Sequence, residues 1–284
     1  MADQITLSPS RVNRWVRCKK TYYWRYHQKL VRLYKNTPFS LGSIVSEALA
    51  GYYRHPTDVR SSEVLRRSLE AAIKKETPRP IGSSEVGKKA LDDWAKAVKI
   101  ATRVLEPYHE WASPKDDFEV IHVEKTQEVQ LSPSVSFLAI PDAVVVVNPE
   151  TPMILEHKVR NKYRVGDFGI DYQSVGSCLV SGAIGTMYNV LEYRKLKNHR
   201  DIIIRSEAEL NYFTDMFIRI GEDILSTPPD QMYPTPMKRC SCDYWELCNG
   251  EMQGLDLDDI ISELYQRTTR KSRKEIDTEE EGGD

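Results

Sequence analysis

The pattern of apolar residues changes part of the way along the chain, and this change constrains the fold more than any other feature. Before about residue 112, apolar side chains recur at helical spacing, as Leu91, Trp94, Val98 and Ala101 do. After it, stretches such as 118–123 alternate apolar and polar residues, as strands with one buried face do. A mainly helical segment followed by strands mixed with helices predicts an α/β protein.

The boundaries of the expected elements follow from this pattern and from turn-forming residues. The segments expected as helices are 9–27, 42–53, 62–75, 85–111, 171–182 and 206–225, of which 85–111 is one long or kinked helix. The segments expected as strands are 118–123, 126–131, 136–147, 153–159 and 186–194, the first run of them forming an antiparallel meander. Ser206 and Glu209 have the spacing of a capping box at the start of the last helix. A proline-rich loop is expected at 227–239.

Composition adds few constraints. Forty Lys and Arg against 42 Asp and Glu give a net charge of -2, and 40% of residues are hydrophobic. This excludes collagen-like, mucin-like and wholly disordered chains. A charge near zero gives no overall argument for nucleic-acid binding, which only local clusters of charge could supply. No apolar stretch is long enough to span a membrane and the first residues do not resemble a secretion signal, so we expect a cytoplasmic protein without membrane contact.

Two acidic residues lie inside neighbouring apolar stretches. Asp142 interrupts a Val- and Ile-rich stretch, and Glu156 lies in the next one, after a turn-forming segment at 148–152. Pairing of the two stretches would bring Asp142 beside Glu156. Since side chains alternate along a strand, Glu156 and Lys158 share one face while His157 points to the other.

Two carboxylates and a lysine at one place suit phosphodiester hydrolysis. Magnesium prefers carboxylate oxygens and water, and it lowers the pKa of a bound water. Lys158 can orient that water or stabilise charge on the phosphate, and the backbone carbonyl of His157 is a further candidate ligand. The alternative is an ordinary surface ion pair between Glu156 and Lys158. The apolar flanks favour a site, because a carboxylate in an apolar stretch needs a partner.

A second motif has the spacing of a phosphate-binding loop. Residues 82–89 match it up to Lys88, but Lys89 stands where Ser or Thr would bind magnesium. No strand precedes the motif either. Because this loop works only between a strand and a helix, we interpret the match as coincidental.

The cysteines divide into a group and a bystander. Cys240, Cys242 and Cys248 lie close together in sequence, and Cys18 lies near the other end of the chain. Four thiols can hold an iron–sulfur cluster or a tetrahedral zinc ion, and the spacing does not decide between them. Unpaired cysteines are the alternative. A shared group would tie the two ends of the chain together. Cys178 is interpreted as a small core residue.

Basic residues gather in two places. Residues 11–35 hold nine Lys or Arg and no acid, with six aromatic residues interleaved. Such residues can contact phosphates and stack on single-stranded bases, but the aromatic residues can equally pack the helix on its neighbours. A second patch directly follows Lys158, which makes it the stronger candidate for holding a substrate backbone. The candidate DNA contacts are Arg17, Lys19 and Lys20 in the first patch and Arg160, Lys162 and Arg164 in the second.

Together these motifs resemble the RecB-like branch of the PD-(D/E)XK nucleases, above all its members with an iron–sulfur staple. These are the CRISPR-associated RecB-like exonucleases, the AddB nuclease domain and related phage exonucleases. The resemblance spans about residues 7–248. The matching motifs are Leu7-Ser8-Pro9-Ser10-Arg11, Cys18-Lys19-Lys20-Thr21-Tyr22-Tyr23, Pro141-Asp142, Glu156-His157-Lys158, and the cysteines from Cys240 to Cys248 with Asp243-Tyr244-Trp245 between them.

The resemblance implies roles for these residues. Asp142 and Glu156 would bind Mg²⁺ or Mn²⁺, Lys158 would be catalytic, and Gln173 falls where the family has a glutamine on the following helix. The cluster ligands would be Cys18, Cys240, Cys242 and Cys248, holding a [4Fe–4S] cluster, with zinc as the alternative. The implied fold is a restriction-endonuclease-like core, a central mixed sheet flanked by helices, with a helical N-terminal part and a C-terminal cysteine-cluster staple.

Three positions depart from the family pattern. Ser46 stands where the family often has a metal-binding histidine, and Glu47 is the nearest substitute, although it points about 100° away around a helix. Ser177 stands where a tyrosine follows the glutamine by four residues. Cys240 and Cys242 are separated by one residue where two are usual. These departures weaken the prediction of the metal site more than the prediction of the fold.

The expected protein is a single nuclease domain at residues 1–267, with a helical part (1–112), a catalytic core (113–226) and a cysteine segment (227–267), before a disordered charged tail at 268–284. Its expected activity is Mg- or Mn-dependent exonucleolytic hydrolysis of single-stranded DNA or DNA ends in recombination, repair or phage DNA metabolism. A recombinase, helicase or single-strand-binding protein is the expected partner, in a bacterial, archaeal or phage-infected cell. The alternative is a weakly active or inactive nuclease fold that binds DNA or acts as a scaffold.

Overall fold

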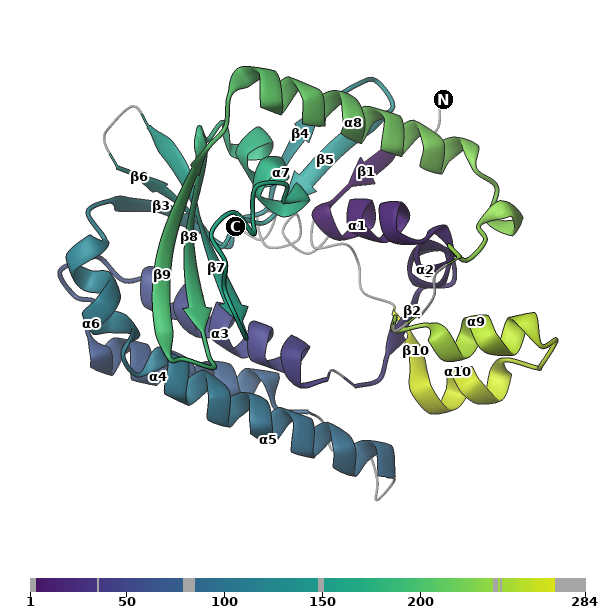
Figure 1. Ribbon diagram of the computed structural model, residues 1–284, viewed down its shortest axis with the longest axis horizontal. Helices are drawn as coiled ribbons and strands as arrows, with labels where there is room; N and C mark the ends of the chain where they lie inside the picture. The colour runs from purple at the N-terminus through teal and green to yellow at the C-terminus, as the bar shows by residue number, and fades with distance from the viewer. Residues whose placement is uncertain are drawn as a thin grey trace, which may run out of the picture. The chain divides into compact units, whose positions relative to one another are not determined.

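The computed structural model describes residues 4–34, 36–78, 85–147, 151–236, 240 and 242–268. The chain falls into two compact units, and each is built from separated stretches of sequence (Figure 1). The first, called the sheet unit below, comprises residues 34–127 and 140–210. The second, called the terminal unit, comprises residues 1–33, 128–139 and 211–284.

The sheet unit is organised around a five-stranded mixed sheet of order β3-β6-β7-β8-β9. The strands are β3 (Glu119–Val123), β6 (Ala143–Val146), β7 (Pro152–Arg160), β8 (Gly185–Glu192) and β9 (Lys197–Ile204). Strands β7 and β8 are parallel, and the other neighbours are antiparallel. The neighbours β3, β6 and β7 therefore have the directions expected of a meander.

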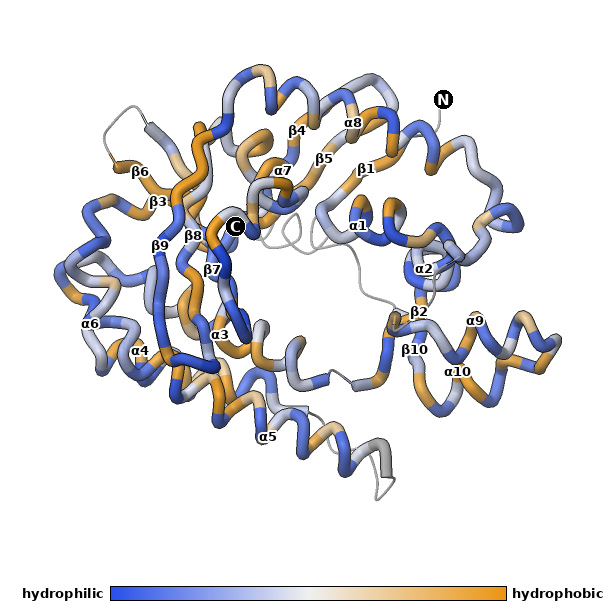
Figure 2. Tube along the Cα trace, viewed as in Figure 1, coloured by the Kyte–Doolittle hydropathy of each residue, from blue (hydrophilic) through white to orange (hydrophobic). Residues whose placement is uncertain are grey.

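Helices cover both faces of this sheet. Helices α3 (Thr37–Tyr53), α4 (Ser62–Glu76), α5 (Glu85–Leu105) and α6 (Tyr108–Ala112) share one core with Val145 and Leu155 of the sheet. Helix α7 (Tyr172–Ser181) shares a second core with the alternate residues Val144 and Ile154. Figure 2 shows β7 changing from hydrophobic to hydrophilic toward its C-terminal end. A mixed sheet flanked by helices confirms the predicted fold class.

The terminal unit joins the two ends of the chain. A three-stranded sheet of order β1-β5-β4 combines β1 (Ile5–Leu7), β5 (Val135–Ala139) and β4 (Gln127–Gln130), with β1 and β5 parallel. Elsewhere in the unit, β2 (Leu30–Arg32) pairs antiparallel with β10 (Tyr265–Arg267). The remaining elements are α1 (Pro9–Arg17), α2 (Lys19–Tyr22), the π-helical turn Tyr23–His27, most of α8 (Glu207–Ser226), α9 (Trp245–Met252) and α10 (Asp258–Leu264).

The single helix predicted at 9–27 is wrong, because the chain breaks it at Cys18. Ser8 caps the start of α1 and accepts a hydrogen bond from the backbone N–H of Arg11, as the Ser-Pro signal predicts. Cys18 then adopts an extended conformation, with φ -168° and ψ 113°. Its carbonyl accepts the hydroxyl of Thr21 at 2.8 Å. The break turns the Cys18 side chain into the core of the terminal unit.

Two other helix boundaries differ for identifiable reasons. Helix α3 begins at Thr37, not at residue 42, because Asn36 caps it and Pro38 fits the first turn. The segment 85–111, predicted as one long or kinked helix, forms two helices: α5 ends at Leu105, and α6 starts after Pro107. Pro107 has no N–H to continue the α5 ladder, so the chain restarts there. Helix α4 is confirmed within one residue of its prediction.

The predicted strand at 136–147 is two strands. Pro141 interrupts it, so that β5 belongs to the terminal unit and β6 to the sheet unit. Strands β9 and β10 and helices α9 and α10 had no prediction. The prediction for 171–182 is confirmed, since Asp171 caps α7 and Gly182, with φ +64°, ends it in the left-handed conformation.

Some predictions fall on residues outside the described ranges. These are the first half of the phosphate-loop-like motif, residues 148–150 of the predicted turn, and the tail beyond Thr268. Among the described residues, no helix combines the length and apolarity that a membrane crossing requires. The prediction of one domain over 1–267 stays a prediction.

Candidate active site

The acidic pair is set by the pairing of β6 with β7. Ala143 lies opposite Leu155 in this antiparallel register, so Asp142, one residue earlier, falls beside Glu156, one residue later. Pro141 lies between β5 and β6, and Asp142 directly precedes β6. The predicted alternation along β7 holds: Glu156 and Lys158 lie on the face covered by α7, and His157 lies on the other face, toward α3.

Glu156, Lys158 and Gln173 form a closed triangle of hydrogen bonds. The Lys158 ammonium donates to Glu156 Oε1 and to Gln173 Oε1, both at 2.8 Å. The side-chain amide of Gln173 donates to the same Glu156 oxygen at 2.6 Å. Gln173 lies in the first turn of α7, directly after the Asp171 cap. The helix start therefore fixes Gln173 over the lysine.

Asp142 is held from two sides. Its Oδ2 accepts the backbone N–H of His157 at 2.8 Å, and the Ser46 hydroxyl donates to Oδ1 at 3.4 Å. Ser46 on α3 therefore occupies the place next to the acidic pair where the family has a histidine. Glu47 does not reach this group, because its carboxylate pairs with Lys75 at 2.7 Å. The expectation that Glu47 serves as a metal ligand has no support in this geometry.

The two carboxylates are costly to ionise together. Burial raises the pKa of Asp142 well above its ordinary value, and the negative charge of Glu156 raises it further. Burial also raises the pKa of Glu156, although the nearby Lys158 ammonium lowers it. Burial lowers the pKa of Lys158, but Glu156 and Asp171 outweigh this and raise it overall. Lys158 is therefore a cation, and one cation faces several carboxylates.

This arrangement fits a divalent cation. Glu156 is 2% exposed, and its Oε2 is buried without a hydrogen-bond partner among the described residues. A buried carboxylate oxygen without a donor is the kind of atom that a metal satisfies. Oxygen donors from Asp142, Glu156 and the His157 carbonyl match the preference of Mg²⁺ and Mn²⁺. Among the described side chains, no three His, Cys, Asp or Glu residues stand close enough to hold an ion by themselves.

Two acids near the site were missed by the sequence reasoning. Asp171 Oδ2 lies 3.8 Å from the Lys158 ammonium and accepts the Tyr188 hydroxyl at 3.3 Å. Glu124 follows β3, and its charge contributes to the raised pKa of Asp142. Asp171 could have been found from the sequence, because it is the capping residue of α7 and therefore lies next to Gln173 in the first turn of that helix. Glu124 carried none.

A buried polar network lies behind the site, on the α3 face. The Tyr53 hydroxyl bonds the Tyr108 hydroxyl at 2.9 Å and donates to Asp116 Oδ2 at 2.8 Å. Burial raises the pKa of both tyrosines, so their hydroxyls stay protonated. The His157 ring stacks on Tyr53 with centroids 5.2 Å apart, and burial lowers its pKa to about 3. His157 is therefore a neutral ring packed in the core.

The basic patch after Lys158 remains accessible. Arg160, Lys162 and Arg164 are all exposed, and the Arg160 guanidinium lies 5.5 Å from the Phe168 ring. Ser177, where the family has tyrosine, is fully buried on α7, and its hydroxyl has no partner among the described residues. Cys178 is 1% exposed and packs in the α7 core, as its sequence context predicted.

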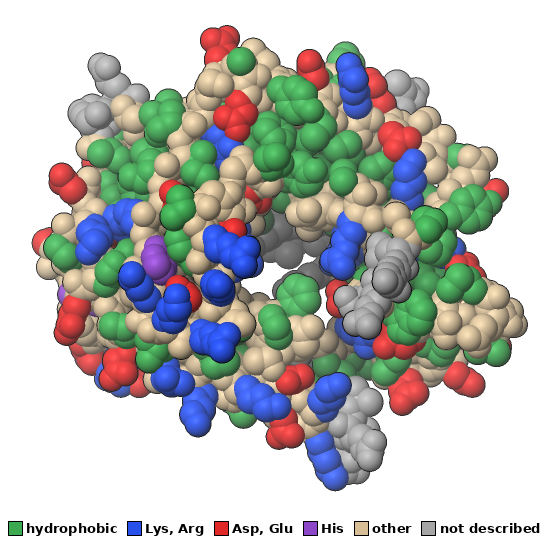
Figure 3. Space-filling model, viewed as in Figure 1, with side chains coloured by type: hydrophobic (Ala, Val, Ile, Leu, Met, Phe, Trp, Pro, Cys, Tyr) green, Lys and Arg blue, Asp and Glu red, His purple; other side chains and the backbone are tan. Residues whose placement is uncertain are grey.

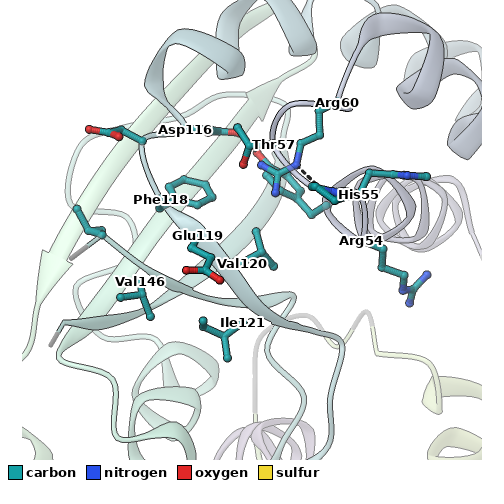
Figure 4. A pocket seen from close by; sticks show the side chains of 14 residues that line it. Arg54, His55, Thr57, Arg60, Asp116, Phe118, Glu119, Val120, Ile121 and Val146 are labelled. Atoms are coloured by element: carbon teal, nitrogen blue, oxygen red, sulfur yellow. Dashed lines mark hydrogen bonds between the residues drawn. The ribbon is translucent and has the colours of Figure 1, made fainter. Parts of the chain in front are cut away.

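A separate hollow of about 820 Å³ lies at the β3 edge of the sheet unit. Figure 4 shows Arg60 at its wall, with its Nε donating to the His55 carbonyl at 2.9 Å. Arg54 and Glu119 also line it. The hollow contains neither residue of the acidic pair, and it lies across the sheet from the β9 edge.

In the terminal unit, the four predicted cluster cysteines come from both ends of the chain. Cys240 and Cys242 have sulfurs 3.4 Å apart. The Trp24 indole N–H donates to Cys248 Sγ at 3.3 Å, and the Thr235 N–H donates to Cys18 Sγ at 3.4 Å. Donors aimed at sulfur are characteristic of thiolates that bind a metal centre.

The thiols also interact electrostatically. Burial raises the pKa of Cys248, and the neighbouring Cys18 raises it further. Burial raises the pKa of Cys242 to about 12, with added contributions from Cys240 and Cys248. No three of the described cysteines stand close enough together to hold an ion by themselves. Charges on Cys242 and Cys240, Cys242 and Cys248, and Cys248 and Cys18 would nevertheless repel one another. The chemistry of these thiols fits a soft metal centre, because metal coordination would remove this repulsion.

The N-terminal basic residues behave differently from the second patch. Lys20 is 8% exposed, pairs with Glu251 at 2.7 Å and lies over the rings of Tyr23 and Trp24. Lys19 pairs with Asp223 at 2.8 Å. Of the three candidate contacts in this stretch, Arg17 is the one that is exposed and has no such pair among the described residues. Lys20 is thus held by contacts within the terminal unit, and its role as a DNA contact stays a prediction. The aromatic residues of this stretch mostly pack the terminal unit.

The geometry defines a class of protein. In an α/β fold, an acidic pair, a lysine and a glutamine meet where the neighbouring strands β6 and β7 lie beside the start of α7. The chain matches the family model of the PD-(D/E)XK nuclease superfamily over residues 6–249. It therefore belongs to the PD-(D/E)XK nuclease superfamily.

Solved structures give more distant likenesses. A predicted exonuclease from Eubacterium rectale is 12% identical, with a TM-score of 0.49, over 86% of this chain and 87% of that one. An alkaline exonuclease from Laribacter hongkongensis is 11% identical, with a TM-score of 0.32, over 64% of this chain and 88% of that one. Similarity this low carries no further argument. A comparison with curated protein sequences gives no match.

Proposed function

We propose that this chain is a Mg²⁺- or Mn²⁺-dependent deoxyribonuclease that degrades DNA from ends or along single strands. One observation carries the proposal: the half-buried Asp142 carboxylate and the buried Glu156 carboxylate meet beside a single hydrogen-bonded Lys158, and Glu156 Oε2 has no partner among the described residues. The superfamily provides the reaction class, and the basic patch after Lys158 provides the means to bind a polyanion.

Asp142, Glu156 and the His157 carbonyl would hold the metal. When bound, it supplies a water of lowered pKa and neutralises charge on the scissile phosphate. The protein's own contribution is preorganisation. The His157 N–H and the Ser46 hydroxyl orient Asp142, so its carboxylate is fixed before substrate arrives.

Lys158 supplies a fixed positive charge at the reacting phosphate. Glu156 and Gln173 hold its ammonium in one position, and Asp171 keeps it protonated from 3.8 Å. A cation held in place by the protein needs no reorganisation as negative charge grows on the phosphate oxygens. Gln173 also connects α7 to the site, because it contacts both Glu156 and Lys158.

The cleavage experiment uses single- and double-stranded oligonucleotides labelled at either end, with Mn²⁺, Mg²⁺ or EDTA. We expect metal-dependent cleavage whose product ladder gives the polarity. Asp142→Ala and Lys158→Ala should each lower the rate at least about 10³-fold, since each removes a group that acts in the transition state. Glu47→Gln is the matched control and should keep full activity, because Glu47 pairs with Lys75. Unchanged cleavage by Lys158→Ala would overturn the assignment.

A weakly active or inactive nuclease fold is the second candidate. Ser46 favours it, because a hydroxyl that donates to Asp142 replaces the histidine that often binds metal in the family. DNA binding without cleavage in either metal would support this candidate. Cleavage abolished by Glu156→Ala would reject it.

The RecB-like iron–sulfur subtype is a further part of the proposal. Cys18, Cys240, Cys242 and Cys248 would hold a [4Fe–4S] cluster, and zinc is the alternative. The sulfur-directed donors Trp24 and Thr235 support a metal centre of either kind. Anaerobic purification should give a brown protein with about four iron atoms per chain; a colourless protein with zinc would select the alternative. The pathway, the helicase or recombinase partner and the cytoplasmic location stay predictions of the resemblance.

A further inference from the structure

A row of cations lies where β7 and β8 end and β9 begins. Arg160 ends β7, and in the register it lies opposite Glu192 of β8, which lies opposite Lys197 of β9. The Tyr193 N–H donates to the Arg160 carbonyl at 2.9 Å, so the β8–β9 hairpin is fastened beside the basic patch. The six members, called the basic edge below, are Arg160, Lys162, Arg164, Arg194, Lys195 and Lys197.

All six side chains of the basic edge are exposed. Figure 3 shows Lys and Arg side chains gathered over the strands β7 to β9. The three hairpin cations lie within four consecutive positions, 194–197, and Leu196 between them has φ +52°. The turn between β8 and β9 therefore holds the three cations close together, on a segment fixed by the paired strands.

The acids nearest the basic edge are already used. Glu192 is 2% exposed and is shared by His199 at 3.2 Å and Lys195 at 3.7 Å. Asp201 accepts the Tyr163 hydroxyl at 2.6 Å. Within the described part of the chain, no carboxylate pairs with Arg194 or Lys197. Arg194 and Lys197 are therefore available to an anionic ligand.

We propose that the β8–β9 hairpin binds the phosphate backbone of DNA and, with the segment 160–164, leads the strand to the acidic pair. This inference rests on the proposed nuclease function. Arg160 follows Lys158 by two strand residues, or about 7 Å, and Lys197 lies two strand spacings further across, or about 10 Å. The basic edge therefore begins beside the catalytic lysine and spans the length of a few nucleotides. Contacts of this kind position a substrate and do not read its sequence.

The test removes the three hairpin charges together, as Arg194→Gln, Lys195→Gln and Lys197→Gln in the full-length protein. Binding of a fluorescent single-stranded oligonucleotide is measured by anisotropy in EDTA over a range of salt concentrations. We expect at least a tenfold weaker Kd near physiological salt. We also expect the slope of log K against log salt to shrink by about 2, since each phosphate contact contributes about 0.7 on a single strand.

A matched control removes three exposed lysines of α5 in the same unit, as Lys88→Gln, Lys89→Gln and Lys99→Gln. It should bind like the unsubstituted protein, which separates a local contact from a change in net charge. In Mn²⁺, the hairpin variant should raise KM while kcat at saturating DNA stays within about twofold. A single reversal, Lys197→Glu, keeps the test valid if the triple variant has a lowered thermal midpoint.

The outcomes separate this inference from the proposed function. If the unsubstituted protein cleaves DNA and the hairpin variants bind as tightly as it does, the hairpin inference is overturned and the nuclease function stands. A loss of affinity equal to that of the α5 control also overturns it. If the unsubstituted protein neither binds nor cleaves DNA, both proposals fail.

Discussion

The acidic pair of the sheet unit and the cysteine group of the terminal unit are both sets of reactive side chains, but they are assembled differently. Asp142 and Glu156 come from consecutive, paired strands and meet through one strand register. Cys18 and Cys248 come from opposite ends of the chain and meet only because both ends fold into one unit. The first set depends on local geometry and the second on long-range closure. The first should therefore tolerate damage elsewhere, and the second should control stability.

The largest effect is expected in the terminal unit. Cys248→Ser should lower the free energy of unfolding by about 3 kcal/mol, because it would open the proposed metal cross-link, which would close a very long loop. The thermal midpoint should fall by about 6–12 °C, and bound metal should be lost. Calorimetry with elemental analysis measures both. Cys178→Ser, in the α7 core, should keep the metal. An unchanged midpoint with no metal in either protein would contradict the cross-link.

The second effect tests the polar network behind the acidic pair. Tyr53→Phe removes a hydroxyl that bonds Tyr108 and Asp116, and it leaves the 5% exposed Asp116 with one partner fewer. We expect a loss of about 2 kcal/mol and a midpoint about 4–8 °C lower. The exposed hydroxyl of Tyr212 in the terminal unit is the matched control, since Tyr212→Phe should change the midpoint by less than about 2 °C. Equal effects of the two substitutions would show that the network contributes nothing.

The third effect has the opposite sign. The folded protein raises the pKa of Asp142, so the folded state binds a proton more readily than the unfolded chain. Stability of the metal-free protein therefore falls as pH rises above the unfolded value near 4, and it stays low above the folded pKa. Asp142→Asn removes this penalty and keeps an acceptor for the His157 N–H. In EDTA at pH 8, the variant should be more stable than the unsubstituted protein, because burial and the charge of Glu156 no longer oppose ionisation at this position.

That gain should fade as pH falls toward the unfolded value near 4 and vanish below it, where Asp142 is protonated in both states. Thermal midpoints at pH 8 and pH 4.5 measure it, and Asp58→Asn on the surface is the control, expected to change neither. A site that lowers stability in order to bind a metal is a common feature of functional sites. A destabilised Asp142→Asn protein at pH 8 would show that the carboxylate is not under electrostatic strain.

The strands of the sheet and the position of the acidic pair could be predicted from the sequence for a physical reason. Alternation along β7 places Glu156 with Lys158 and against His157, and this needs no knowledge of the rest of the fold. The Asp171 cap likewise fixed the start of α7. Breaks in the chain were harder to predict, because Cys18 and Pro141 redirect it through tertiary packing that periodicity does not record. The hairpin cations lie near the segment 160–164 because β9 pairs with β8, and the sequence did not predict β9.

Charge is hard to interpret from sequence without knowing which side chains are buried. A run of nine cations in residues 11–35 suggested a nucleic-acid surface. In the structure, Lys20 is buried in the terminal unit and pairs with Glu251, and Lys19 pairs with Asp223. The segment 160–164 is similarly basic but stays exposed, because the acids beside it are bound to other partners. The difference depends on residues near the other end of the chain, which the local sequence does not record.

The smallest effect follows from this contrast. Lys20→Gln removes an ammonium that pairs with Glu251 and lies 4.4 Å from the centroid of the Tyr23 ring. Stability should fall by about 1 kcal/mol, which lowers the midpoint by about 2–4 °C, while affinity for DNA stays within twofold. Arg160→Gln should do the reverse, weakening DNA binding severalfold with little change in the midpoint. Anisotropy and calorimetry on the two variants therefore give opposite patterns if one cation is structural and the other binds phosphate. Weaker DNA binding by Lys20→Gln at an unchanged midpoint would return Lys20 to the DNA-binding surface.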